Sequence, residues 1–114
     1  MMKTDGKLDY LEMQAGDGAL AGVKAFYAAA FGWRFTDYGP SYAAFDEGLD
    51  GGFDGTAARG TKPLPVLYAR DIDKTLAAVT AAGGTIVKPI FSFPGGRRFH
   101  FTDPAGNELA VWSE

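Results

Sequence analysis

The chain has a single imidazole, His100, and this residue type is the best suited to acid–base chemistry near neutral pH. The segment Asp103–Asn107 predicts a tight turn between two strands. If that turn closes a simple hairpin, Thr102 lies opposite Glu108 and His100 lies opposite Ala110. His100 is therefore a candidate general acid or base. The alternative is that it only makes hydrogen bonds within a polar sheet face.

A second group of chemically capable side chains occurs near the start of the chain. Tyr10, Glu12 and Gln14 alternate with Leu11 and Met13, which is typical of a strand with one polar face. Glu12 is a candidate catalytic base, or a counter-charge for a cationic ligand. Tyr10 and Gln14 are candidates for the wall of a binding pocket. The alternative is an ordinary solvated strand face.

Aromatic residues make up 14% of the chain, and some of them are suited to stacking on a planar ligand. We expect most of them in the core and select Tyr42 and Trp112 as ligand-binding residues, with Arg98 beside Trp112. The segment Gly95–Arg98 has the backbone N–H groups and guanidinium groups that bind phosphate or carboxylate. No helix follows it, so a hairpin turn with two surface arginines is the simpler interpretation.

Composition excludes several classes of protein. A length of 114 residues and a mass of 12.1 kDa predict one domain, or two very small units that share a core. A net charge of −3 gives no basic surface for nucleic acid, and the absence of Cys excludes disulfides and thiol chemistry. No apolar run is long enough to cross a membrane, and the polar first residues do not resemble a secretion signal. We therefore expect a cytoplasmic protein.

Hydrophobic periodicity predicts the elements of the first half. Leu8–Gln14 is a strand, and a helix then runs from an N-cap at Asp17 to a stop at Gly32. The apolar stripe of this helix is expected to be core. Its residues are Leu20, Val23, Phe26, Tyr27, Ala30 and Phe31. Three further strands are predicted, at 33–38, 42–46 and 49–53.

The second half repeats this order after a linker at 54–63. A strand at 64–69 is followed by a helix that begins at Asp71 or Asp73 and stops at Gly83–Gly84. Three strands follow, and Pro89 inside the first of them predicts an edge strand or a bulge. These strands are expected at 85–93, 97–102 and 108–112.

Each half reads as strand, helix and about three strands, so the chain is an α+β protein built from two βαβββ modules. A unit this short cannot cover both faces of its own sheet, and the two modules are expected to share one structure with the helices outside. We therefore predict one domain over 1–114. Module one covers about 8–53, the linker 54–63 and module two about 64–112.

Several short motifs occur together in the order and spacing of a known family. They are Phe26–Tyr27, Phe31–Trp33, Asp71–Asp73, Ala82–Gly84 and Asp103–Asn107. With these motifs the chain, from about residue 8 to 112, resembles the vicinal oxygen chelate superfamily of glyoxalases, bleomycin-resistance proteins and dioxygenases. The resemblance implies a curved mixed sheet with a cup-like cavity, and assembly as a homodimer.

In the catalytic members of that family, the cup holds a divalent metal on four ligands. The resemblance places these ligands at Tyr10, at Gly51 or Gly52, at Pro65 and at Ala110. Gly, Pro and Ala have no ligating side chain, and a neutral Tyr is a poor ligand. We therefore expect no metal and no other cofactor. A shifted alignment would bring in only Glu12 or Glu108.

These observations favour a metal-free cup that binds a small, partly aromatic or oxygenated molecule. Its expected ligand-binding residues are Tyr10, Gln14, Tyr42, Arg98, Glu108, Ala110 and Trp112. The alternative is a lyase or isomerase related to lactoylglutathione lyase. It would use a shifted metal site, or metal-free acid–base chemistry by His100 with Glu12 as a second catalytic candidate. A purely structural dimer would leave the polar strand faces unexplained.

Overall fold

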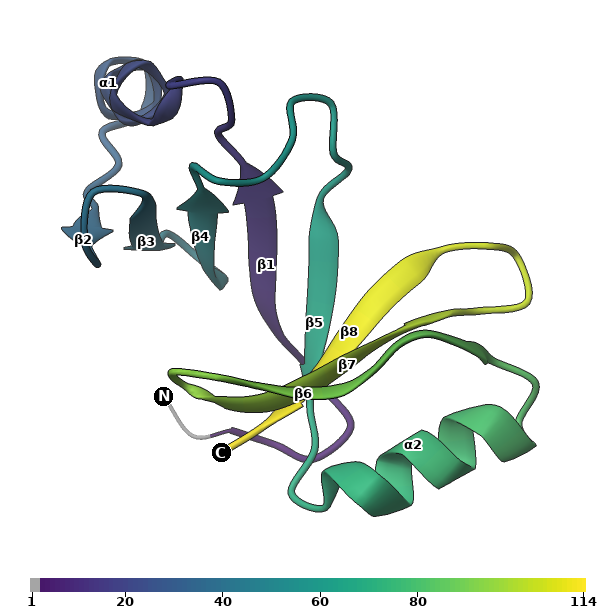
Figure 1. Cartoon of the computed structure of the whole chain (residues 1–114). Helices are drawn as coiled ribbons and strands as arrows, with labels where there is room; N and C mark the ends of the chain where they lie inside the picture. Colours follow the sequence, from purple (N-terminus) through teal and green to yellow (C-terminus); the bar gives the residue numbers. More distant parts are fainter. Residues whose placement is uncertain (1–2) are drawn as a thin grey trace. The chain divides into compact units, whose positions relative to one another are not determined.

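The computed structural model describes residues 3–114, which divide into two compact units. We call Tyr10–Pro63 the N-terminal unit, and residues 3–9 together with Leu64–Glu114 the C-terminal unit. Within the described residues the elements follow the order β1 α1 β2 β3 β4 and then β5 α2 β6 β7 β8 (Figure 1). The α+β class and the two βαβββ modules predicted from the sequence are confirmed.

The N-terminal unit contains one helix and four short strands. Their bounds are β1 Leu8–Gln14, which enters this unit at Tyr10, α1 Leu20–Phe31, β2 Thr36–Asp37, β3 Tyr42–Asp46 and β4 Asp50–Asp54. The strand order is β2-β3-β4-β1. Strand β4 runs parallel to β1 and antiparallel to β3, so it brings β1 and β3 to either side of itself.

The C-terminal unit has the same topology with longer strands. Its elements are β5 Leu64–Tyr68, α2 Ile72–Ala81, β6 Thr85–Phe93, β7 Gly96–Thr102 and β8 Glu108–Ser113. The order is β5-β8-β7-β6, with β5 parallel to β8 and the other pairs antiparallel. Helix α2 lies along this set of strands in Figure 1. The repeat that the sequence indicates is therefore a repeat of topology.

One face of each set of strands packs against the helix of its own unit. In the N-terminal unit the buried core is Ala15, Phe45 and Phe53, against which Leu20, Val23 and Tyr27 of α1 pack. In the C-terminal unit the core is Ala69, Ile72, Phe99 and Val111, with Leu76 and Val79 of α2 against it. Because side chains alternate along a strand, the residues between these point to the opposite face. We call that opposite face the helix-free face of each unit.

The prediction for the stripe of α1 is wrong in three places, because Phe26, Ala30 and Phe31 are exposed. Phe26 and Phe31 are 58% and 66% exposed, and the three remaining stripe residues are half-buried, so no residue of α1 is fully buried. Phe26 and Phe31 stack edge-on with each other, at a centroid distance of 6.3 Å, on the flank of the helix. Only the side of the helix that carries Leu20, Val23 and Tyr27 packs against the core, so the predicted stripe is broader than the face that α1 buries.

The two helices begin differently. Of the two predicted candidates, Asp71 and not Asp73 caps α2, and its Oδ1 accepts a hydrogen bond from the backbone N–H of Lys74 at 3.1 Å. The predicted cap of α1 is wrong, because α1 starts at Leu20 with no side-chain cap and Asp17 lies in a loop with φ of 58°. The stop at Gly32 is confirmed, with the left-handed φ of 73° that a glycine adopts without strain.

The predicted strand bounds agree best with the structure where a tight turn marks the end of the strand. The segment 33–38 forms only the two-residue β2, because only Thr36 and Asp37 pair with β3, while Trp33 and Phe35 lie before the strand and pack against the core. Pro89 lies in β6, which is at the edge of its unit and shows register shifts on both sides of Lys88. The edge strand and bulge expected from that proline are therefore confirmed.

The turn between β7 and β8 forms as predicted. The N–H of Gly106 donates to the carbonyl of Asp103 at 2.9 Å, and Gly106 has φ of 88°. The resulting register places Thr102 opposite Glu108 and His100 opposite Ala110. Within residues 3–114, no helix is long and apolar enough to cross a membrane.

Candidate functional site

On the helix-free face of the N-terminal unit, three side chains form a hydrogen-bonded chain. The hydroxyl oxygens of Tyr10 on β1 and Tyr42 on β3 are 2.6 Å apart, and the Tyr42 hydroxyl donates to Oε2 of Glu12 at 3.2 Å. Tyr42 has only one proton, so when it donates to Glu12 the shared hydrogen bond comes from Tyr10. The sequence predicted each residue as a site candidate, and the structure brings all three together.

Gly52 on β4 is the reason why the two tyrosines meet. The strand that carries it runs between β1 and β3, and a Cβ at position 52 would overlap both tyrosine hydroxyls. Burial raises the pKa of Tyr42 and of Tyr10, so both hydroxyls keep their protons near neutral pH. Gln14, also a predicted ligand-binding residue, instead accepts a hydrogen bond from the N–H of Gly16 at 3.0 Å.

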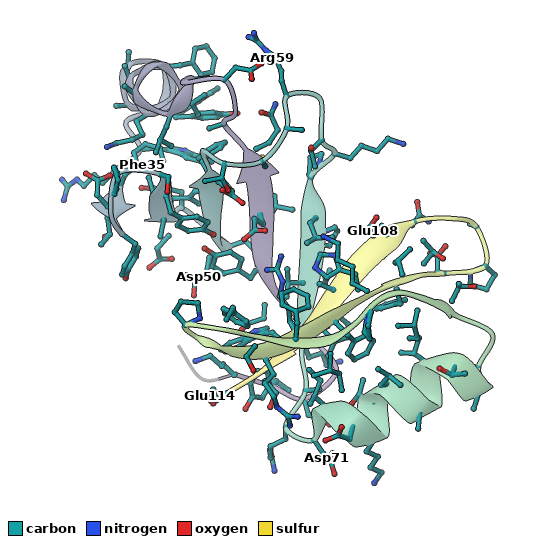
Figure 2. All side chains as sticks on the ribbon, viewed as in Figure 1. Phe35, Asp50, Arg59, Asp71, Glu108 and Glu114 are labelled. Carbon is teal, nitrogen blue, oxygen red and sulfur yellow. The ribbon has the colours of Figure 1, made fainter. Side chains whose placement is uncertain are left out.

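On the helix-free face of the C-terminal unit, His100 is paired with Glu108. His100 is only 3% exposed, and its Nδ1 lies 3.0 Å from Oε2 of Glu108. The two residues are diagonal neighbours across the β7–β8 ladder, since Glu108 itself faces Thr102. Figure 2 shows Glu108 at the start of β8, beside the turn that the sequence predicted.

The second ring nitrogen of His100 has no such partner. Its Nε2 is buried and makes no hydrogen bond within the part of the chain that the structure describes. Burial lowers the pKa of His100, the hydrogen bond from Nδ1 to Glu108 opposes that shift, and the positive charges of Arg98 and Lys88 add to it. The neutral imidazole is therefore favoured, with one unsatisfied buried nitrogen.

Aromatic rings border His100 on this face. The ring of Phe91 lies 5.9 Å from the His100 ring, and the Arg98 guanidinium lies over Phe91 and Phe93 at 5.6 and 5.8 Å. Trp112 lies 6.3 Å from Phe93, and its Nε1 donates to Asp9 at 2.9 Å. The predicted residues Arg98 and Trp112 thus belong to the same face as His100, together with two phenylalanines that the sequence did not single out.

The four positions at which the family resemblance places metal ligands have few ligating atoms. Tyr10 is bonded to Tyr42, and Ala110 is completely buried beside Val66 of β5. Neither a glycine at 51 or 52 nor Pro65 has a ligating side chain. Over residues 3–114, no group of three or more His, Cys, Asp or Glu side chains is arranged to hold a metal ion.

Sequence reasoning missed the pairing of His100 with Glu108, although the signal was available. The predicted hairpin sets Glu108 opposite Thr102, two residues from His100 and on the same face of the strands. Diagonal pairs of this kind are within reach of long side chains. The contact of Tyr10 with Tyr42 had no such signal, because it depends on β4 lying between two strands that are distant in the sequence.

Comparison with solved structures shows proteins of the same fold at low identity. An NAD-dependent benzaldehyde dehydrogenase structure from Legionella pneumophila matches with a TM-score of 0.73 and 14% identity, covering 91% of this chain and 96% of that chain. Methylmalonyl-CoA epimerase from Mycobacterium tuberculosis matches with a TM-score of 0.72 and 12% identity, over 99% and 92%.

A third structure carries the family's own description. It is a glyoxalase/bleomycin resistance protein/dioxygenase superfamily member from Vibrio splendidus 12B01, with a TM-score of 0.69 and 15% identity, covering 95% of this chain and 100% of that chain. Identities this low show the fold alone. A search of curated proteins found no match.

The sequence profile of one family matches almost the entire chain, from residue 7 to residue 111. The match includes both βαβββ modules and agrees with the fold of the solved structures. The resemblance drawn from the short motifs is thereby confirmed. This chain belongs to the Glyoxalase/Bleomycin resistance protein/Dioxygenase superfamily.

Proposed function

We propose that this chain binds a small, partly aromatic or oxygenated molecule on the helix-free face of the C-terminal unit. The observation that supports this most is the buried Nε2 of His100, which has no partner within residues 3–114. Buried polar atoms are nearly always hydrogen-bonded, so such an atom calls for a ligand or a water. The rings of Phe91, Phe93 and Trp112 supply apolar contact area beside it.

The proposal includes binding without a divalent metal. The residues at the family's ligand positions do not fit an ion, because Gly52 has no room for a side chain and Tyr10 already shares its hydroxyl with Tyr42. The carboxylates that a shifted site would use are also engaged. Glu12 accepts from Tyr42, and Glu108 is bonded to His100. No step of the function is assigned to a metal here.

A second candidate function is a lyase or isomerase, which the pairing of His100 with Glu108 favours. A carboxylate at Nδ1 orients an imidazole and stabilises its protonated form, so Nε2 can take a proton from a substrate. This version needs no metal. Activity that depends on added metal would instead support the shifted site.

Two measurements test the proposed function. Calorimetric titration with Ni²⁺, Zn²⁺ and Mn²⁺ is expected to show no stoichiometric binding, and micromolar binding would overturn the metal-free proposal. Melting curves with aldehydes, glutathione adducts and aromatic antibiotics are expected to give a stabilising shift with at least one class. His100→Phe is expected to remove that shift, and Glu47→Gln, a change in the other unit, to keep it. An equal shift in His100→Phe would exclude this face.

Several predictions from the sequence stay predictions. They include ligand contacts by Tyr10, Gln14 and Tyr42, catalysis by Glu12, and the homodimer. Sedimentation equilibrium of the purified protein measures the last of these directly, and a monomer at all concentrations would contradict it.

A further inference from the structure

The inference below rests on the proposed function and concerns what Glu108 does for the same site. We propose that Glu108 fixes the tautomer of His100, so that Nε2 is a hydrogen-bond acceptor and the site selects ligands with a neutral hydroxyl or ring N–H on a planar ring. Glu108 is then a positioning residue that determines specificity through His100.

The first step is the proton on Nδ1. An ionised carboxylate can only accept hydrogen bonds, so the 3.0 Å contact with Glu108 Oε2 requires Nδ1 to carry the proton. In a neutral imidazole the other nitrogen then has a lone pair and no proton. Without a carboxylate at this position, either ring nitrogen could be protonated. The identity of residue 108 thus decides whether the buried nitrogen accepts or donates.

The second step is the environment of Nε2. This atom is buried and has no partner in residues 3–114, so a ligand that offers it no donor leaves its desolvation uncompensated. A site with a buried acceptor therefore discriminates strongly against an analogue that lacks the donor. The neighbouring ring of Phe91, 5.9 Å from the imidazole, favours a planar group next to that donor.

The third step is the charge of the donor. Lys88 on β6 lies directly opposite His100 in the β6–β7 pair, and Arg98 lies two residues before His100 on β7. Both are cations that lower the pKa of His100, and Glu108 on β8 carries the opposite charge. An ammonium donor would meet like charge here, whereas a hydroxyl or ring N–H would not. The geometry therefore points to a neutral donor.

The first experiment reads the tautomer without any ligand. Because His100 is the only histidine, ¹⁵N-histidine labelling of protein without a polyhistidine tag gives one pair of imidazole nitrogen signals. A two-bond ¹H–¹⁵N spectrum is expected to show Nδ1 protonated and Nε2 unprotonated. Glu108→Gln, at a side chain that is 47% exposed, is expected to lose this fixed assignment. Glu47→Gln is the matched control, because Glu47 belongs to the other unit, where it accepts a hydrogen bond from the N–H of Arg34. A protonated Nε2 in the unchanged protein would overturn the proposal.

The second experiment adds two probes with the same ring system, 2-naphthol and its methyl ether, 2-methoxynaphthalene, in which a methyl group replaces the hydrogen of the donor. In the unchanged protein, 2-naphthol is expected to shift the Nε2 signal and to bind at least about tenfold more tightly than the ether. In Glu108→Gln this preference is expected to shrink, because Nε2 can then donate to the ether oxygen. Equal binding of both probes would reject the specificity while leaving the proposed function in place. If neither probe binds and the tautomer is as expected, the role of Glu108 in holding the tautomer stands and aromatic ligand binding fails.

Discussion

On the helix-free face of the N-terminal unit, Tyr10, Tyr42 and Glu12 hydrogen-bond to one another across Gly52. On that of the C-terminal unit, His100 uses one nitrogen for Glu108 and keeps the other buried without a partner in residues 3–114. The two units share one topology, so this difference comes from side chains and not from the arrangement of strands.

The helix-free faces of the two units thus differ in whether their polar groups satisfy one another. Polar groups that satisfy each other stabilise a unit and leave little for a ligand, whereas an unsatisfied buried acceptor weakens the unit unless something binds there. This contrast supports the proposal that the tyrosine chain is mainly structural and that the His100 region binds the ligand. The predictions below test this contrast, beginning with the largest expected effect.

Gly52→Ala is expected to destabilise the protein by about 2 to 3 kcal/mol, because the added Cβ overlaps the hydroxyls of Tyr10 and Tyr42. Urea denaturation measures the change in the free energy of unfolding. Gly22→Ala is the control, since nothing lies within 4 Å of its Cβ and it is inside α1. That change is expected to stabilise by about 0.5 to 1 kcal/mol. If Gly52→Ala were as stable as the parent protein, the hydroxyls of Tyr10 and Tyr42 would not lie against position 52.

The free energy of unfolding is expected to fall on acidification below about pH 6.5, by at most about 1.4 kcal/mol per pH unit. Burial lowers the pKa of His100 in the folded state, with Arg98 and Lys88 adding to the shift and Glu108 opposing it. The unfolded chain therefore takes up the proton first, and the loss ends once the pH is below the folded-state pKa. Denaturation curves of His100→Gln should lack this decline. A decline of the same size in that variant would assign it to other groups.

The two tyrosines are expected to be coupled by about 1 kcal/mol. A double-mutant cycle with Tyr10→Phe, Tyr42→Phe and the double variant measures this coupling, since each single change removes one hydroxyl without removing a ring. Ligand-induced melting shifts should be unchanged in Tyr10→Phe if the chain is mainly structural. Loss of ligand binding in that variant would instead place the tyrosine chain in the site.

The helix starts give the smallest effects. Asp71→Ala is expected to destabilise by about 0.5 to 1 kcal/mol, because its carboxylate caps α2. Asp17→Gly is expected to change stability by less than about 0.5 kcal/mol or to stabilise slightly, because Asp17 caps nothing and has φ of 58°. Thermal melts of both variants measure the difference. A larger loss for Asp17→Gly than for Asp71→Ala would reverse the assignment of caps.

Local signals in the sequence were sufficient for much of the fold. The tight turn at Asp103–Asn107, the cap at Asp71, which is one of two predicted candidates, and the stop at Gly32 depend on residues within a few positions of each other, and each is present in the structure. The hairpin register, with His100 opposite Ala110, followed from the turn alone. The cap at Asp17 failed because Asp is also common in left-handed loop conformations, which periodicity cannot distinguish from a cap.

The sequence by itself determined the α+β class, the two βαβββ modules and the residues available for chemistry. Only the tertiary structure decided which polar groups satisfy each other. Tyr10 reaches Tyr42 because β4 runs between β1 and β3, two strands far apart in the sequence, and because Gly52 of β4 has no side chain between the two hydroxyls. The strands packed around His100 bury its ring. Within residues 3–114, one ring nitrogen then contacts Glu108 and the other has no hydrogen-bond partner. Hydrogen-bond satisfaction is a property of three-dimensional neighbours, and local sequence patterns do not specify those.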